Sequence, residues 1–159
     1  ETTDKRRAYL KAVNVYDEAW TPTLVGYGVN RATGDRVSIR IAEMYLIAAE
    51  AGSYLPSELN NAKKYLLDLQ KKRLTPEGYA AKETAVEAMN AEQLRAEVAD
   101  ERARELLMEG HRWMDLRRTT RPSITKTHNG STYTLTENDS RYTLPFPQSA
   151  VNNNPHLND

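Results

Sequence analysis

The pattern of apolar and polar positions predicts a chain built mainly from α-helices. From Arg40 to Tyr54, apolar residues cover well over half of the circumference of a helix, which places this helix at the centre of the fold. Pro56 ends the helix, and Ser57 is expected to cap the next one. The apolar stripe of the first helix is expected at Ile41, Met44, Tyr45, Ala48, Gly52 and Leu55, widened by Leu46 and Ile47.

A second amphipathic helix is predicted from Ser57 to about Lys72. Its apolar residues recur at three- and four-residue spacing and form a single stripe, at Leu59, Ala62, Leu66 and Leu69. Together with the preceding helix it resembles one tetratricopeptide-type helical hairpin, with small residues where the helices cross. One such hairpin cannot bury its own apolar face, so the fold needs further helices.

The most informative helix is predicted to begin after Asn90. Asn90 and Gln93 fit a capping box, and Gly110 is the first residue that suits a helix end. A last short helix is then expected at Arg112–Arg118. In the helix that begins after Asn90, the apolar residues Leu94, Val98 and Met108 share one sector with three carboxylates. These carboxylates are Glu101, Glu105 and Glu109.

We interpret these carboxylates as part of a partly buried structural ion-pair network, because an unpaired buried charge is very costly. Arginines close in sequence are the expected partners, with Trp113 and Leu116 packed beside them. These arginines are Arg102, Arg104, Arg112, Arg117 and Arg118. The predicted motif comprises Glu101, Arg102, Glu105, Glu109, Arg112, Trp113, Asp115 and Arg117.

Three other interpretations of the same stretch are open. Paired carboxylates can perform acid–base catalysis, for which Glu105 and Glu109 would be the candidates. A glutamate cluster with His111 can bind a metal, and the surface can also serve a partner protein. Arginine neighbours, however, hold carboxylates ionised and leave them poor proton donors, and the HExxH zinc spacing is absent. We therefore predict no catalytic residue and no metal-ligating residue.

Residues 1–38 are expected to form an irregular loop region, apart from a short helix from Asp4 to Val13. Glycines and a turn signal divide the region into short extended pieces. Its aromatic residues are the candidates for ligand binding, because the apolar face of a sugar stacks on an aromatic ring. They are Trp20, Tyr27 and Tyr16. The alternative is that these rings cover the apolar face of the helices that follow.

The remaining segments are a connection, a hairpin and a tail. Leu74 to Asn90 is expected to be a connection with a short helix at Ala80–Met89. Ile124 to Leu135 is predicted to be a β-hairpin, because it contains Asn129-Gly130, the strongest short hairpin-turn signal. Arg141 to Asp159 is expected to be an extended strap, because its prolines forbid a regular helix.

Composition bounds the size and the class of the protein. The 159 residues suit a single domain, with a helical core at 39–118 and the hairpin and extended tail at 119–159. The 22 lysines and arginines balance 22 aspartates and glutamates, which argues against nucleic-acid binding and against a polybasic membrane-surface protein. The absence of cysteine excludes a disulfide framework, a thiolate metal site and a cysteine nucleophile. No apolar run is long enough to span a bilayer. The sequence contains no phosphate-binding glycine loop, so it predicts no cofactor.

Three stretches of the chain carry motif-like runs. They read RIAEMYLIAAEA from Arg40 to Ala51, ERARELLMEGHRWMDLRR from Glu101 to Arg118, and LPFPQSAVNNNPHL from Leu144 to Leu157. In this order they resemble motifs of the SusD/RagB family of outer-membrane nutrient-binding lipoproteins. The chain departs from the family pattern at positions that would carry no chemistry, namely Ala103, Phe146 and Ala150.

The resemblance implies the C-terminal part of a SusD-type protein, with tetratricopeptide-like helices, a small β-hairpin and long loops. It implies a surface lipoprotein of the Gram-negative outer membrane, with its signal peptide and lipid anchor outside this chain. It further implies non-catalytic capture of a glycan or other nutrient, without a cofactor, for a SusC-like TonB-dependent transporter, as in polysaccharide utilisation. No binding residue can be transferred by motif. The alternative is a helical-repeat protein-interaction scaffold without a small-molecule ligand.

Overall fold

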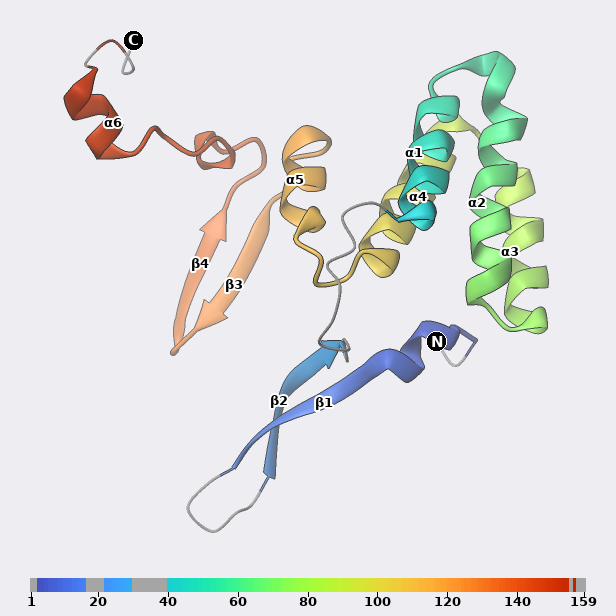
Figure 1. Cartoon of the computed structure of the whole chain (residues 1–159), viewed down its shortest axis with the longest axis horizontal. Helices are drawn as coiled ribbons and strands as arrows, with labels where there is room; N and C mark the ends of the chain where they lie inside the picture. Colours follow the sequence, from blue (N-terminus) through green and yellow to red (C-terminus); the bar gives the residue numbers. More distant parts are fainter. Residues whose placement is uncertain (1–2, 17–21, 30–39, 155, 157–159) are drawn as a thin grey trace. The chain divides into compact units, whose positions relative to one another are not determined.

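A computed structural model describes residues 3–16, 22–29, 40–154 and 156 of the chain (Figure 1). These residues are mostly helical, with small antiparallel pairs of strands, which confirms the predicted mainly-α fold class. The chain divides into two compact units, Glu1–Glu109 and Gly110–Asp159. The single-domain organisation stays a prediction.

Four helices form the body of the first unit (Figure 1). They are α1 (Ile41–Ser53), α2 (Leu59–Arg73), α3 (Pro76–Ala88) and α4 (Ala91–Glu105). Helix α1 packs against α2 and α4, and α2 also packs against α3 and α4. Their shared core is aliphatic and contains Leu46, Leu66, Leu67, Leu69, Val86, Leu94 and Val98.

The buried face of α1 differs from the predicted stripe. The helix buries Ala42, Leu46, Ala49 and Ser53, whereas Ile41 is 77% exposed and several other members of the predicted stripe are exposed as well. The prediction was wrong because α1 is apolar around most of its circumference, so periodicity could not select a face. The face that α1 buries carries the small residues Ala42, Ala49 and Ser53 beside Leu46.

Helix boundaries follow the local capping signals where these are present. The capping box of α4 is confirmed, since the Asn90 side chain accepts from the Gln93 backbone N–H at 2.9 Å and the Gln93 side chain accepts from the Asn90 N–H at 2.9 Å. Helix α3 is longer than predicted, because Thr75 caps it and Pro76 opens it. Helix α4 ends at Glu105 rather than at Gly110, which instead adopts a left-handed conformation (φ +86°) directly before α5.

The described part of residues 1–38 contains a β-hairpin, where the sequence predicted a short helix and short extended pieces; residues 17–21 and 30–38 lie outside the described residues. A 3₁₀ helix at Lys5–Tyr9 (η1) leads into β1 (Leu10–Tyr16), which pairs antiparallel with β2 (Pro22–Val29) through a β-bulge. The predicted helix from Asp4 to Val13 is therefore wrong beyond Tyr9. The sequence LKAVNVY is rich in β-branched and aromatic residues, which favour strands.

The second unit contains α5 (His111–Arg118), β3 (Ile124–His128), β4 (Ser131–Leu135), η3 (Ser140–Tyr142) and α6 (Gln148–Asn153). Strands β3 and β4 confirm the predicted hairpin, and both turn residues adopt positive φ angles, as a type I′ turn requires. Helix α6 corrects the prediction of a wholly extended tail. It fits between two prolines, starting directly after one and ending before the next, so neither ring breaks its hydrogen bonds.

Candidate functional site

Two glutamates on α4 are buried, although carboxylates normally lie at the surface. Glu101 is 1% exposed and Glu105 is 6% exposed. They are four residues apart, so they lie on the same face of the helix as Leu94 and Val98, which belong to the core. Such burial requires compensating partners for both carboxylates.

Three arginines bind the Glu105 carboxylate. Arg73 from the end of α2 binds it in a bidentate manner, with Nε 2.8 Å from Oε2 and Nη2 2.8 Å from Oε1. Arg40, which precedes α1, places Nη2 2.6 Å from Oε1. Arg6 from η1 places Nη1 3.0 Å from Oε2. Both carboxylate oxygens are therefore saturated by charge-assisted hydrogen bonds.

Glu101 is bound from two sides. Arg6 Nη1 lies 2.6 Å from its Oε1, and Arg104 Nη2 lies 2.8 Å from its Oε2. The amide of the fully buried Gln70 donates to Oε2 at 3.1 Å. Arg6 is thus shared by Glu101 and Glu105, and it links their two sets of partners into one network.

Further charges surround this pair of glutamates. Glu97 accepts from Lys82 and Arg104 at 2.8 Å each, Asp4 pairs with Arg6 at 2.7 Å, and Glu109 pairs with Arg40. We call the whole set the carboxylate–arginine cluster. It comprises Asp4, Arg6, Arg40, Arg73, Lys82, Glu97, Glu101, Arg104, Glu105 and Glu109.

The cluster keeps its two central carboxylates ionised. Burial alone would raise the pKa of Glu101, but the charges and hydrogen bonds of Arg6 and Arg104 outweigh it and hold that pKa below its usual value. Burial also acts to raise the pKa of Glu105, and the hydrogen bond and charge of Arg73, with the charges of the other arginines, lower it overall. Two carboxylates in this state have no proton to donate near neutral pH.

Acid is expected to remove the stability that these two carboxylates supply. Because the folded pKa of each lies below the unfolded value of about 4.3, their contribution is complete above that pH and is lost as the pH falls through the folded pKa. Urea unfolding at a series of pH values should therefore show a steeper loss of unfolding free energy below about pH 4 in the wild-type chain than in a Glu101→Gln variant. Equal slopes in the two proteins would contradict this linkage.

The structure brings together only part of the predicted motif. Glu101, Glu105 and Glu109 lie in the cluster, and Arg102 lies 3.7 Å from Glu43. Among the arginines predicted as partners for the glutamates, Arg104 binds both Glu97 and Glu101. The other members of the motif are on α5 in the second unit, namely Arg112, Trp113, Asp115 and Arg117.

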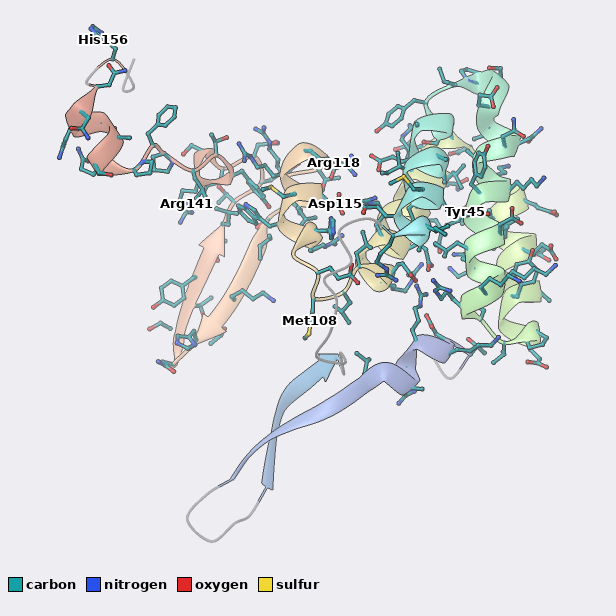
Figure 2. All side chains as sticks on the ribbon, viewed as in Figure 1. Tyr45, Met108, Asp115, Arg118, Arg141 and His156 are labelled. Carbon is teal, nitrogen blue, oxygen red and sulfur yellow. The ribbon has the colours of Figure 1, made fainter. Side chains whose placement is uncertain are left out.

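On α5 these residues make contacts of their own. Asp115 and Arg118 form an ion pair at 2.9 Å, one helical turn apart (Figure 2). The ring of Trp113 stacks on Tyr142 with a centroid distance of 5.0 Å. Tyr142 is fully buried, and its hydroxyl donates to the carbonyl of Pro122.

Sequence reasoning missed all three arginines on Glu105. Arg6 and Arg73 lie 99 and 32 positions away from it along the chain, and nothing in their local sequence indicates a buried partner. Arg40 belongs to the first of the motif-like runs, which is the one signal that pointed to its environment. Arg104 could be found because it lies close to Glu101 in sequence. The arginines that bind Glu105 come from other elements and could not be found in this way.

The predicted ligand-binding aromatics remain predictions. Tyr16 ends β1, and Tyr27 stands opposite Ala12 in the register of β2, but the side chains of both lie outside the described residues. Trp20 falls in residues 17–21, which are also outside them. Among the described aromatic residues, Tyr54 and Tyr133 have the most exposed side chains, and the guanidinium of Arg95 lies 4.8 Å from the ring centre of Tyr54.

Within the described residues, no group of acidic or histidine side chains has the arrangement of a metal site. Every described helix is too short or too polar to cross a bilayer.

Comparison with known proteins identifies the family. Curated proteins give no match to the chain, but the sequence model of the SusD family matches residues 9–159, which is nearly the whole chain. The chain therefore belongs to the SusD family.

Proposed function

We propose that the protein captures a nutrient, an oligosaccharide or polysaccharide, without cleaving it, at the outer face of the outer membrane. The captured molecule would pass to a SusC-like TonB-dependent transporter. The observation that carries this proposal is the family match over residues 9–159, because SusD-family proteins are generally non-catalytic binding proteins that work with such transporters. A lipid anchor would attach the protein to the membrane.

The carboxylate–arginine cluster gives no support to a hydrolytic role. The two central glutamates are saturated by arginines, so Glu101 and Glu105 offer neither a proton donor nor a free base for hydrolysis of a glycosidic bond. Hydrolysis of that kind needs two carboxyl groups of which one is protonated. We therefore assign the cluster a structural role and place ligand contact at the aromatic residues Trp20, Tyr27 and Tyr16.

Replacing Trp20 with alanine is expected to weaken glycan binding by roughly fivefold, because loss of a stacked ring removes on the order of 1 kcal/mol. Isothermal titration calorimetry with a polysaccharide that the wild-type chain binds measures the change in affinity, and urea unfolding measures the change in stability. The matched control is Tyr133→Ala, which removes an exposed ring from the other unit. If Trp20→Ala lowers stability and leaves affinity unchanged, the ring packs against the helices and does not stack on the ligand.

One observation favours a second function, that of a helical protein-interaction scaffold. The solvent side of α1 is apolar over its length, with Ile41, Met44 and Ile47 exposed, and exposed apolar surface of this kind marks interaction sites. An Ile47→Glu variant separates the two functions. A scaffold would lose its protein partner and show no glycan binding in either form, whereas the capture function predicts that glycan binding survives the substitution.

A further inference from the structure

The segment Thr3–Tyr9 lies against the turn between α2 and α3, and we call it the Arg6 strap. The Thr75 N–H donates to the Thr3 carbonyl at 2.9 Å. Next to this hydrogen bond, Asp4 forms an isolated antiparallel β-bridge with Leu74. The strap therefore meets the helices of the first unit through its backbone at one end.

The Arg6 strap is held by polar contacts. Among its side chains that the structure describes, none is buried, and Lys5, Arg7 and Ala8 are exposed. The helices, by contrast, share an aliphatic core. A segment that buries little apolar surface loses little hydrophobic free energy when it detaches, so it can open while the core stays folded.

Arg6 makes the charged contacts of the strap. Asp4 holds one edge of its guanidinium within the strap, with Nε 3.0 Å from Oδ1 and Nη2 2.7 Å from Oδ2. The remaining nitrogen, Nη1, lies 2.6 Å from Oε1 of Glu101 and 3.0 Å from Oε2 of Glu105. The strap thus presents a pre-oriented guanidinium to two carboxylates on the buried face of α4.

The helices hold these two carboxylates independently of the strap. Arg104 binds Glu101 from α4, and Arg73 binds Glu105 from α2. The carboxylate–arginine cluster contains as many carboxylates as cations, so it carries an excess negative charge once Arg6 leaves. Excess negative charge beside two positioned carboxylates favours the return of a guanidinium group.

We propose that Glu101 and Glu105 form a guanidinium-binding site on α4, which the chain fills with its own Arg6, and that the Arg6 strap detaches from this site while the helices stay folded. The vacated site accepts another guanidinium group. A guanidinium suits the site better than an ammonium does, because it is more weakly hydrated and enters a largely buried position at a lower cost.

Chemical rescue of an Arg6→Ala variant of the full chain tests the binding site. The substitution should lower the midpoint of thermal unfolding by roughly 5–10 °C, because it leaves buried carboxylates without a cation. Methylguanidinium at about 10 mM should recover a large part of this loss and leave the wild type unchanged, because Arg6 already fills the wild-type site. Methylammonium, which carries the same charge, should recover little.

Two further variants control the rescue. Arg7→Ala removes the exposed arginine next in sequence and should show neither the loss nor the recovery. A double variant, Arg6→Ala with Glu101→Gln, lacks one acceptor of the site and should not respond to methylguanidinium. Equal recovery of Arg6→Ala by both cations, or recovery by neither, would overturn the guanidinium site.

Hydrogen exchange at Thr75, followed by NMR, tests the release of the strap, because this N–H donates to the Thr3 carbonyl. Exchange at Thr75 should rise by about tenfold in Arg6→Ala, while exchange in the core of α2 and α4 changes much less. Methylguanidinium should leave Thr75 exchange fast even as it raises the unfolding midpoint, because a free cation fills the site without reattaching the strap.

A second variant releases the strap without removing a charge. A Cβ atom on Gly78 of α3 would lie 2.6 Å from the Thr3 Cβ, so Gly78→Ala should displace the strap. Exchange at Thr75 should rise in this variant too, which keeps the release testable should Arg6→Ala fail to fold. Unchanged Thr75 exchange in the variants that fold, or an equal rise throughout the helices, would show that the strap does not detach by itself.

Discussion

The Glu105→Gln variant is expected to lose about 3–5 kcal/mol of unfolding free energy, the cost of breaking a buried ion pair by removing one partner. Glutamine keeps the size of the side chain but not its charge. Arg6, Arg40 and Arg73 would then share a buried site without the carboxylate that neutralises them. Amide N–H groups would also face guanidinium groups, which are donors only.

Urea unfolding followed by circular dichroism measures this loss. Asp100→Asn on the same helix is the matched control, because Asp100 is exposed and a surface change of this kind stays within about 0.5 kcal/mol. A Glu105→Gln variant as stable as Asp100→Asn would show that the three arginines are solvated well enough to do without the carboxylate. The structural role assigned to the cluster would then be wrong.

Replacing Tyr142 with alanine is the second change with a large expected effect, about 3–5 kcal/mol of stability in the second unit. Among the residues that the structure describes in this unit, only Tyr142 is buried, and Trp113 stacks directly on it. Alanine would leave a cavity under the indole ring. It would also leave the Pro122 carbonyl without its hydroxyl donor.

Hydrogen–deuterium exchange in α5, β3 and β4 measures the effect, and two variants separate its causes. Tyr142→Phe keeps the ring and removes only the hydroxyl, which should cost about 1 kcal/mol. Tyr133→Ala removes an exposed tyrosine of the same unit and should change exchange little. If Tyr142→Ala resembles Tyr133→Ala, the stacked pair does not hold the second unit together.

Features that depend on neighbours in sequence were predictable. The capping box of Asn90 and Gln93 and the turn at Asn129-Gly130 each need only a few adjacent residues, and both are present. The sector of α4 that carries Glu101 and Glu105 follows from helical periodicity, which also indicated that these carboxylates need partners. Their burial in the structure agrees with that reasoning.

Features that depend on residues far apart in sequence were not predictable. Arg6 and Arg73 reach Glu105 from other elements, and only the folded chain brings them there. The buried face of α1 was missed for a different reason. Its circumference is so apolar that the packing of α2 and α4, rather than its own pattern, selects the face that contains Leu46.

Native affinity electrophoresis through gels that contain different polysaccharides tests the central claim most directly. Retardation of the chain by at least one polysaccharide, with no release of reducing sugar from it, is the result that non-catalytic glycan capture predicts. Release of reducing sugar would contradict the non-catalytic part of the account. Unretarded migration through every polysaccharide would contradict glycan capture by this chain and favour a protein-interaction scaffold.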